Sequence, residues 1–178
     1  MIKLAIVGTG SMSHDHFKAF NKINDVKIVA ACDVKKNKLR AFAKKYNIEN
    51  SYTSFDELLS NCEVDAISNV TPDSFHKEIA IKSLKNNKHI FSEKPLATNY
   101  PDAFEMYQET KKKKLINMIN FSYRNSSGYQ NLVQIIRSGK LGSVKHVDAS
   151  YYQSWLTCKY YGDWKVDDHI KWRLSTKH

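Results

Sequence analysis

The stretch IKLAIVGTGSMS, residues 2–13, gives the clearest indication of a fold in this chain. Its apolar start predicts a buried β-strand, and residues 11–23 predict a helix directly after it. Between them, Gly8 permits a tight turn, and Gly10 allows the backbone to approach a pyrophosphate at the helix N-terminus. Ser13 stands where such turns carry a third small residue. The pattern therefore predicts a dinucleotide-binding βαβ unit, with an ordinary glycine turn and a capping serine as the alternative.

A carboxylate at the end of the next predicted strand indicates which dinucleotide fits. That strand covers residues 26–33, and Asp33 lies 20 residues beyond Ser13. A carboxylate in this place accepts hydrogen bonds from the ribose hydroxyls of NAD, whereas it would repel the 2′-phosphate of NADP. No arginine comes directly after Asp33, although Lys35 and Lys36 would partly neutralise its charge. We therefore expect NAD as the cofactor, in preference to NADP.

The rest of the N-terminal part alternates apolar runs with amphipathic segments. Such alternation predicts a parallel sheet of right-handed βαβ units, and strands without polar alternation predict helices on both faces. We expect a doubly wound α/β domain over residues 1–122. Its further strands are predicted at residues 64–71, 88–95 and 115–121, and its further helices at residues 35–46, 54–59, 75–84 and 102–112.

The remaining residues, 123–178, have a different pattern. A helix is predicted over residues 126–138, with Gly139 after its end, and residues 143–156 show the partial alternation of a strand. One long strand does not form a stable sheet alone. We therefore expect residues 123–178 to be the incomplete start of a second domain, with a mostly antiparallel sheet.

Charge and composition exclude several classes of partner. The net charge is +10, but it comes from 24 lysines and only four arginines. Because arginine is better suited to bidentate phosphate and guanine contacts, no nucleic-acid partner is expected. The densest lysine block, residues 111–114, lies where a helix would end and so matches the helix dipole, with a polyanion-binding patch as the alternative.

The expected cellular compartment is inferred from the membrane, targeting and cysteine patterns of the sequence. It contains no run of about 18 apolar residues, so no membrane span is expected. The N-terminus does not resemble a signal peptide. The three cysteines, Cys32, Cys62 and Cys158, have neither disulfide nor zinc spacing, and no metal site is expected. We therefore expect a cytoplasmic protein.

Polar residues follow two later strands, at the edge where open α/β sheets bind ligands. Thr71-Pro72 and His76 follow the strand at residues 64–71, and Glu93-Lys94-Pro95 ends the strand at residues 88–95. A lysine there, beside a cofactor, can exchange a proton with a substrate hydroxyl or carbonyl oxygen. The alternative is a surface Glu-Lys pair before a proline turn.

Several of these segments together resemble one family, the Gfo/Idh/MocA oxidoreductases. The segments are GTGSMSHDH (8–16), Asp33, NVTPDSFH (69–76), SEKPLA (92–97), NFSYR (120–124) and IIRSGKLGSV (135–144), in order and at the family's spacing. The resemblance implies an N-terminal Rossmann domain and a C-terminal α/β domain with a mostly antiparallel sheet. It also implies NAD(P)-dependent oxidation or reduction of a hydroxyl-bearing carbon in a sugar, cyclitol or related polyol.

The resemblance also assigns roles to individual residues. The dinucleotide would be bound by Gly8, Gly10, Ser11, Met12 and Asp33. The nicotinamide side would be lined by Thr71, Pro72, His76 and Glu93. Lys94 would be the catalytic lysine, before a cis peptide bond to Pro95, and would also contact cofactor and substrate, as would Arg124. Trp172 and Arg173 would lie near the substrate, while His14 and His16 are interpreted as packing or surface residues.

One departure from the family concerns length. Family members are usually about twice as long, and their glycine-rich segment with its Asp/His pair would follow Trp172-Arg173; the terminal His178 is not that histidine. We therefore expect an N-terminal portion that is inactive alone and belongs to a homo-oligomer when full length. The alternative is a non-catalytic dinucleotide-binding module or a redox-sensing subunit.

Overall fold

The computed structural model describes residues 1–154, 157–158 and 162–167. The chain divides into two units, Met1–Asn120 and Phe121–His178, and each is described here by itself. Trp172 and Arg173, both predicted near the substrate, lie outside the described residues.

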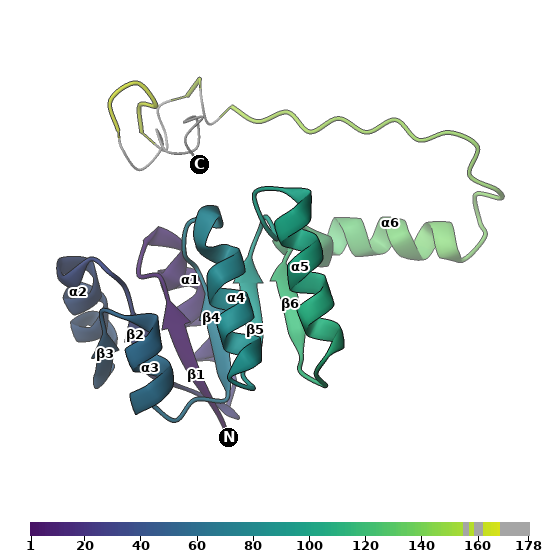
Figure 1. Ribbon diagram of the computed structural model, residues 1–178. Helices are drawn as coiled ribbons and strands as arrows, with labels where there is room; N and C mark the ends of the chain where they lie inside the picture. Colours follow the sequence, from purple (N-terminus) through teal and green to yellow (C-terminus); the bar gives the residue numbers. More distant parts are fainter. Residues whose placement is uncertain (155–156, 159–161, 168–178) are drawn as a thin grey trace. The chain divides into compact units, whose positions relative to one another are not determined.

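A six-stranded sheet forms the centre of the first unit, and all of its neighbouring strands are parallel (Figure 1). The strand order is β3-β2-β1-β4-β5-β6. The strands are β1 (Ile2–Val7), β2 (Val26–Cys32), β3 (Asn50–Tyr52), β4 (Ala66–Asn69), β5 (His89–Glu93) and β6 (Asn117–Asn120). This order confirms the predicted doubly wound Rossmann fold, because the chain moves outward from β1 first on one side and then on the other.

Five α-helices and one short 3₁₀ helix connect these strands within residues 1–120. They are α1 (Ser11–Phe20), α2 (Lys36–Tyr46), α3 (Phe55–Asn61), η1 (Asp73–Phe75), α4 (His76–Lys85) and α5 (Tyr100–Lys111). Helices α3, α4 and α5 lie on the face of the sheet turned to the viewer in Figure 1, and α1 and α2 cover the opposite face.

Apolar side chains fill both spaces between sheet and helices. Ile6 of β1 packs with Leu39 and Phe42 of α2 on one face, whereas its neighbours Ala5 and Val7 belong to the cluster on the other. This alternation places successive side chains of a strand on opposite faces, and both faces are buried. The strand therefore reads as a continuous apolar run in the sequence.

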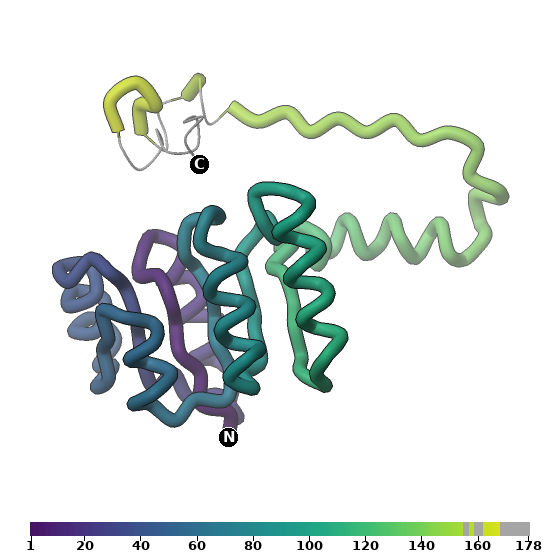
Figure 2. Tube along the Cα trace, in the orientation of Figure 1, coloured from purple at the N-terminus to yellow at the C-terminus, as the bar shows by residue number. Residues whose placement is uncertain are grey.

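The parallel strands bring their carboxyl ends to one edge of the sheet, the upper edge in Figure 2. β1 lies between β2 and β4, so the loops after β1 and β4 flank the point where the strand order reverses. Ligands of open α/β sheets bind in the crevice at such a point. The fold thus places the glycine turn, the end of β2 and the loops after β4 and β5 along one edge.

Some predicted boundaries differ from the structure. The short edge strand β3 was not predicted, because three residues are too few to show a periodic pattern. Helix α1 ends at Phe20 rather than residue 23, and α5 begins at Tyr100 rather than residue 102. The earlier start of α5 has a local cause, since the Asn99 side chain accepts a hydrogen bond from the Asp102 amide and caps the helix.

The described part of the second unit contains the 3₁₀ helix η2 (Ser122–Asn125) and the helix α6 (Ser127–Arg137), which is capped by the Ser126 hydroxyl. The strand predicted from residue 143 is not present over the described residues 143–154. A strand needs a ladder of hydrogen bonds to a neighbour, and no ladder forms along that stretch. The antiparallel sheet of a second domain therefore stays a prediction.

None of the helices in the described ranges is long and apolar enough to cross a membrane.

Candidate active site

Gly8 is the residue that brings the loop after β1 against the loop after β4. Its φ is +93°, and a Cβ at this position would lie 2.6 Å from the carbonyl oxygen of Val70. The Val70 amide donates to Val7 O at 2.7 Å and holds this approach, while the Gly8 amide donates to Cys32 O at 2.8 Å and joins the turn to the end of β2. Only glycine fits both the backbone conformation and the space.

Gly10 precedes helix α1 and has a different environment. Its φ is −76°, and a Cβ built there would meet no atom within 4 Å. No side chain caps the helix, and the Ser13 hydroxyl donates to Gly10 O at 2.5 Å, so it does not occupy the helix N–H groups. Ser11 and Met12, both exposed, begin the helix. The N-terminus of α1 therefore presents free N–H groups beside open space, which suits a phosphate.

Asp33, at the carboxyl end of β2, is tied to the glycine turn. Its Oδ2 accepts hydrogen bonds from the Thr9 amide at 2.7 Å and from the Thr9 hydroxyl at 2.8 Å. Its Oδ1 accepts one from the Lys35 amide at 2.8 Å. A carboxylate has about four acceptor positions, so these bonds leave one on Oδ1 for a ligand hydroxyl.

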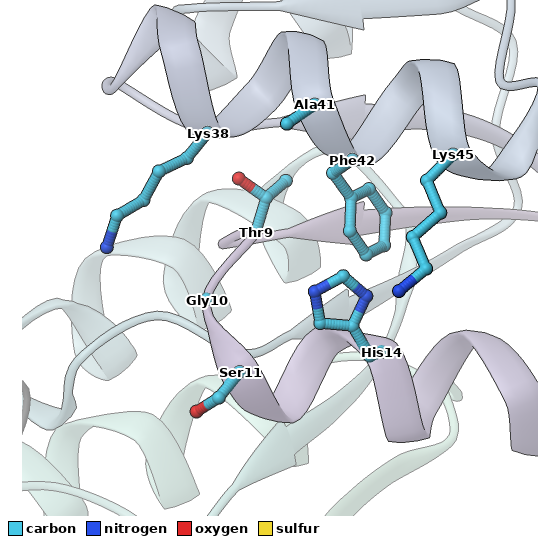
Figure 3. A pocket seen from close by; sticks show the side chains of 8 residues that line it. All are labelled: Thr9, Gly10, Ser11, His14, Lys38, Ala41, Phe42 and Lys45. Carbon is cyan, nitrogen blue, oxygen red and sulfur yellow. The ribbon is translucent and has the colours of Figure 1, made fainter.

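A pocket of about 290 Å³ lies between the glycine turn, α1 and α2 (Figure 3). In Figure 3, Lys38, Phe42 and Lys45 reach it from α2, and His14 reaches it from α1. The His14 Nδ1 lies 2.8 Å from the Tyr46 hydroxyl. Burial, and then the charge of Lys45, lowers the pKa of His14, so its ring is neutral at neutral pH. The pocket is thus basic at its rim and aromatic inside.

Two residues, Asn69 and Thr71, form hydrogen bonds that fix the carboxyl end of β4. Asn69 is fully buried, and its Oδ1 accepts hydrogen bonds from the Thr71 hydroxyl at 2.7 Å and from the Thr71 amide at 3.3 Å. Its Nδ2 donates to the Ser92 hydroxyl at 3.3 Å on the neighbouring strand. Pro72 ends this turn and precedes η1. Asn69 therefore connects the loop after β4 to the last residues of β5.

His76, predicted to line the nicotinamide side, is only 1% exposed. Its Nδ1 lies 2.7 Å from the carbonyl oxygen of Pro95, and its Nε2 lies 3.0 Å from that of Thr71. Both ring nitrogens are therefore engaged with the backbone, and the ring joins the loops after β4 and β5. A direct contact of His76 with the cofactor stays a prediction.

Lys94 lies in the turn after β5 with an exposed side chain, and its peptide bond to Pro95 is cis, as the family resemblance implies. The preceding Glu93 is buried, and its Oε2 accepts a hydrogen bond from the Lys94 amide at 3.2 Å. The turn therefore exposes a lysine beside a buried carboxylate, at the same edge of the sheet as the glycine turn.

The Glu93 carboxylate belongs to a buried polar network. Its Oε1 accepts hydrogen bonds from His16 Nε2 at 2.8 Å and from Asn120 Nδ2 at 2.6 Å. The His16 Nδ1 lies 2.8 Å from the Ser68 hydroxyl. Burial alone would raise the pKa of Glu93, but the hydrogen bonds from His16 and Asn120 outweigh burial and lower it. Glu93 is therefore ionised at neutral pH.

One predicted site residue belongs to the second unit, which is described by itself. Arg124 lies in η2, which belongs to the other unit, and its place in the site stays a prediction. Among the residues that the structure describes, no cluster of histidine, cysteine and acidic side chains could hold a metal ion.

Four residues that organise the site were not singled out from the sequence: Thr9, Asn69, Asn120 and Ser68. His14 and His16 were interpreted as packing or surface residues. The structure shows that both rings do pack, but His14 also lines the pocket and His16 also binds Glu93. Asn120 pairs with Glu93 in the β5–β6 register. A polar residue at the end of a predicted strand would have been the signal for each of the two asparagines.

The glycine turn, the acid at the end of β2 and the free helix N-terminus at the switch point define a dinucleotide-binding Rossmann domain. More particularly, the chain belongs to the oxidoreductase family GFO_IDH_MocA, whose model, described as an oxidoreductase family with an NAD-binding Rossmann fold, matches residues 2–121. This match confirms the family resemblance and the NAD-binding character of the domain.

Known proteins similar to this chain include several inositol dehydrogenases. An inositol 2-dehydrogenase of Salmonella typhimurium is 31% identical over 156 residues, which are 86% of this chain and 46% of the relative. A myo-inositol 2-dehydrogenase of Thermotoga maritima is 30% identical over 79% of this chain and 42% of the relative. A crystal structure of scyllo-inositol dehydrogenase from Lactobacillus casei with bound NAD(H) and scyllo-inositol matches with a TM-score of 0.76 and 28% identity, over 80% of this chain and 42% of that one. The chain thus spans less than half the length of these relatives.

Proposed function

We propose that the chain is the cofactor-binding portion of an NAD-dependent dehydrogenase that acts on a CH–OH group of a sugar, cyclitol or related polyol. The observation that carries the proposal is the arrangement of Gly8, Gly10 and Asp33 at the switch point. The turn leaves open space at the N-terminus of α1, and the acid keeps an acceptor position. The inositol dehydrogenases among its relatives support the substrate class.

Each element of the edge has a part in binding the dinucleotide. Gly10, Ser11 and Met12 would present backbone N–H groups to the pyrophosphate, which the positive end of the helix dipole favours. Asp33 would accept a hydrogen bond from a hydroxyl of the adenosine ribose through Oδ1. The loops that carry Thr71, Pro72 and the Glu93-Lys94 pair would then flank the nicotinamide end.

Lys94 is proposed as the group that moves the substrate proton. When bound, NAD supplies the acceptor for the hydride that leaves the substrate carbon. The Lys94 Nζ would take the hydroxyl proton during oxidation and return it during reduction. Arg124, Trp172 and Arg173 are proposed to lie on the substrate side, in the second domain of a longer protein. Homo-oligomerisation and a cytoplasmic location stay predictions.

A thermal-shift titration of this chain with NADH and, separately, NADPH tests the cofactor part of the proposal. Stabilisation grows with the ratio of ligand concentration to Kd, by about 2.7 kcal/mol at a hundredfold excess over Kd. We expect the melting temperature to rise with NADH at lower concentrations than with NADPH. A melting temperature that responds to neither dinucleotide would contradict the proposal.

The catalytic part needs a protein that includes the second domain. There, Lys94→Ala should retain NADH binding and reduce turnover of a polyol by about 100-fold or more. Unchanged turnover would remove Lys94 from the mechanism. NADH binding without turnover of any polyol would instead favour a non-catalytic dinucleotide-binding module.

A further inference from the structure

The turn that carries Lys94 is held on its N-terminal side by a buried histidine. His16, a residue of α1 that is 4% exposed, donates through Nε2 to the Oε1 of Glu93, which is 7% exposed. The His16 ring is itself fixed, because its Nδ1 contacts the Ser68 hydroxyl and its face packs against Phe91 at a centroid distance of 5.5 Å. The carboxylate of Glu93 therefore has little freedom to rotate.

A neighbouring strand adds to this hold. Asn120 pairs with Glu93 in the β5–β6 register, and its Nδ2 donates to the same Oε1 at 2.6 Å. The other oxygen, Oε2, accepts the hydrogen bond from the Lys94 amide. The chain of contacts thus runs from His16 through the Glu93 carboxylate to the backbone of Lys94.

A second buried histidine holds the C-terminal side of the same turn. His76, at the start of α4, contacts the Pro95 carbonyl oxygen through Nδ1 and the Thr71 carbonyl oxygen through Nε2. Carbonyl oxygens only accept hydrogen bonds, so the ring donates to them through a nitrogen that carries a proton. His76 therefore ties the residue after Lys94 to the loop after β4.

The side chain of Lys94 is the exposed group between these anchors. The residue before Lys94 is bonded through its carboxylate, and the residue after it through its carbonyl. This contrast matters because a displacement of a reacting group by about 1 Å can reduce a rate by about 100-fold. Because the backbone is fixed on both sides, the position of the Lys94 Cα, from which the side chain extends, is fixed as well.

We propose that His16 and His76 are positioning residues for Lys94, which together clamp the Glu93-Lys94-Pro95 turn from opposite faces of the sheet. The functional side of this inference rests on the proposed role of Lys94. The mechanical side concerns the chain alone: loss of either histidine should loosen the turn while the sheet remains folded.

Hydrogen exchange of the Lys94 amide, followed by NMR on the ¹⁵N-labelled 178-residue chain, tests the clamp. In His16→Leu and in His76→Leu, this amide should exchange about 10-fold faster or more, the factor expected for one lost hydrogen bond. The amide of Ile6, in the centre of the sheet, should keep its protection. His16→Gln should largely restore slow exchange at Lys94, because a glutamine amide can donate to Glu93 and accept from Ser68.

His89→Leu is the matched control. His89 begins β5 at the end opposite Lys94 and accepts a hydrogen bond from the Ile116 amide at 2.9 Å. Its replacement should leave exchange at Lys94 unchanged. Unaltered Lys94 exchange in both His16→Leu and His76→Leu would overturn the clamp, as would equal acceleration at Lys94 and Ile6, which would indicate general destabilisation.

A double-mutant cycle on polyol turnover, in a protein that includes the second domain, tests whether the histidines act through Lys94. If they do, the loss of turnover caused by His16→Leu or His76→Leu should largely disappear in a Lys94→Ala background, while NADH binding is retained. Additive losses would show that the histidines act on the fold rather than on Lys94. A wild-type chain that fails to bind NADH would contradict the proposed function instead, and the exchange experiment would still decide whether the clamp exists.

Discussion

Thr9 donates two hydrogen bonds to one oxygen of Asp33, from its amide at 2.7 Å and from its hydroxyl at 2.8 Å. Thr9 is the residue between the two glycines of the turn, and Asp33 ends the neighbouring strand β2. The turn that would hold a pyrophosphate and the acid that would hold a ribose are thus joined directly. Their spacing is set by these two hydrogen bonds of the chain itself.

The hydroxyl of Thr9 can be removed at nearly constant volume. Thr9→Val keeps the amide bond to Asp33 but loses the bond from Oγ1, so a partly buried charged acceptor loses one of its donors. We expect the free energy of unfolding to fall by about 1.5–3 kcal/mol, the range for hydrogen bonds to charged groups. Urea denaturation measures this change.

Thr110→Val provides the comparison, because its hydroxyl donates to a neutral carbonyl, Tyr107 O, on an exposed helix surface. This variant should be less destabilised than Thr9→Val. An equal fall in the free energy of unfolding of the two variants would show that the Thr9–Asp33 bond stabilises the fold no more than a bond to a neutral carbonyl.

Substitution by alanine should affect stability at one glycine of the turn and NADH binding at the other. Gly8→Ala places a methyl group 2.6 Å from Val70 O at a φ of +93° and should destabilise the fold by about 2–4 kcal/mol. Gly10→Ala meets no atom within 4 Å and should leave the melting temperature unchanged. The added methyl group should nevertheless weaken NADH binding, because it occupies space proposed for the pyrophosphate. Thermal melts with and without NADH measure both effects.

Gly128→Ala is the control for this pair, since its Cβ also meets no atom within 4 Å but lies on α6. It should retain the response to NADH. A Gly10→Ala variant that binds NADH as the wild type does would place the pyrophosphate elsewhere.

The sequence was sufficient for the parts of the site that depend on backbone geometry. Gly8, Gly10 and Asp33 were predicted because a glycine turn between strand and helix has few physical explanations, and the structure places them at one edge. Lys94 and its cis peptide followed from the family resemblance rather than from periodicity. These features are local or lie at a standard spacing along the chain.

The parts that were not predicted depend on contacts between distant segments. His16 and Glu93 are 77 residues apart, and Asn120 meets both only because β6 pairs with β5. No local pattern distinguishes a histidine that packs from one that also binds a buried carboxylate. Strand register had to be known before this network could be recognised.

The acid sensitivity of folding should depend on Glu93. Its pKa lies below its ordinary value in the folded chain, so the native state binds this proton less readily than the unfolded state. The stability that Glu93 contributes is therefore fully present above its unfolded pKa and is lost as pH falls through the lower folded value. Glu93→Gln should show a shallower loss of stability as the pH falls below about 5, measured by urea denaturation at each pH.

Glu49→Gln removes an exposed carboxylate and controls for the loss of one negative charge. Asp102 and Glu109 also have lowered pKa values, through Lys77 and Lys112, and remain in both variants. The difference between the two pH profiles therefore reports Glu93 alone. Superimposable profiles would show that the network with His16 does not favour the ionised carboxylate.

The charge of Asp33 should determine the choice between NADH and NADPH. Asp33→Asn retains an acceptor for Thr9 but removes the negative charge that would repel a 2′-phosphate. We expect the ratio of NADPH to NADH affinity to rise by about 10-fold, which corresponds to about 1.4 kcal/mol. Asp65→Asn is the matched control, because Asp65 also accepts a hydrogen bond from a backbone amide, that of Lys3 at 2.7 Å, but lies at the opposite edge of the sheet. If Asp33→Asn left the affinity ratio unchanged while Thr9→Val still lowered stability, Asp33 would support the turn without contacting the ribose.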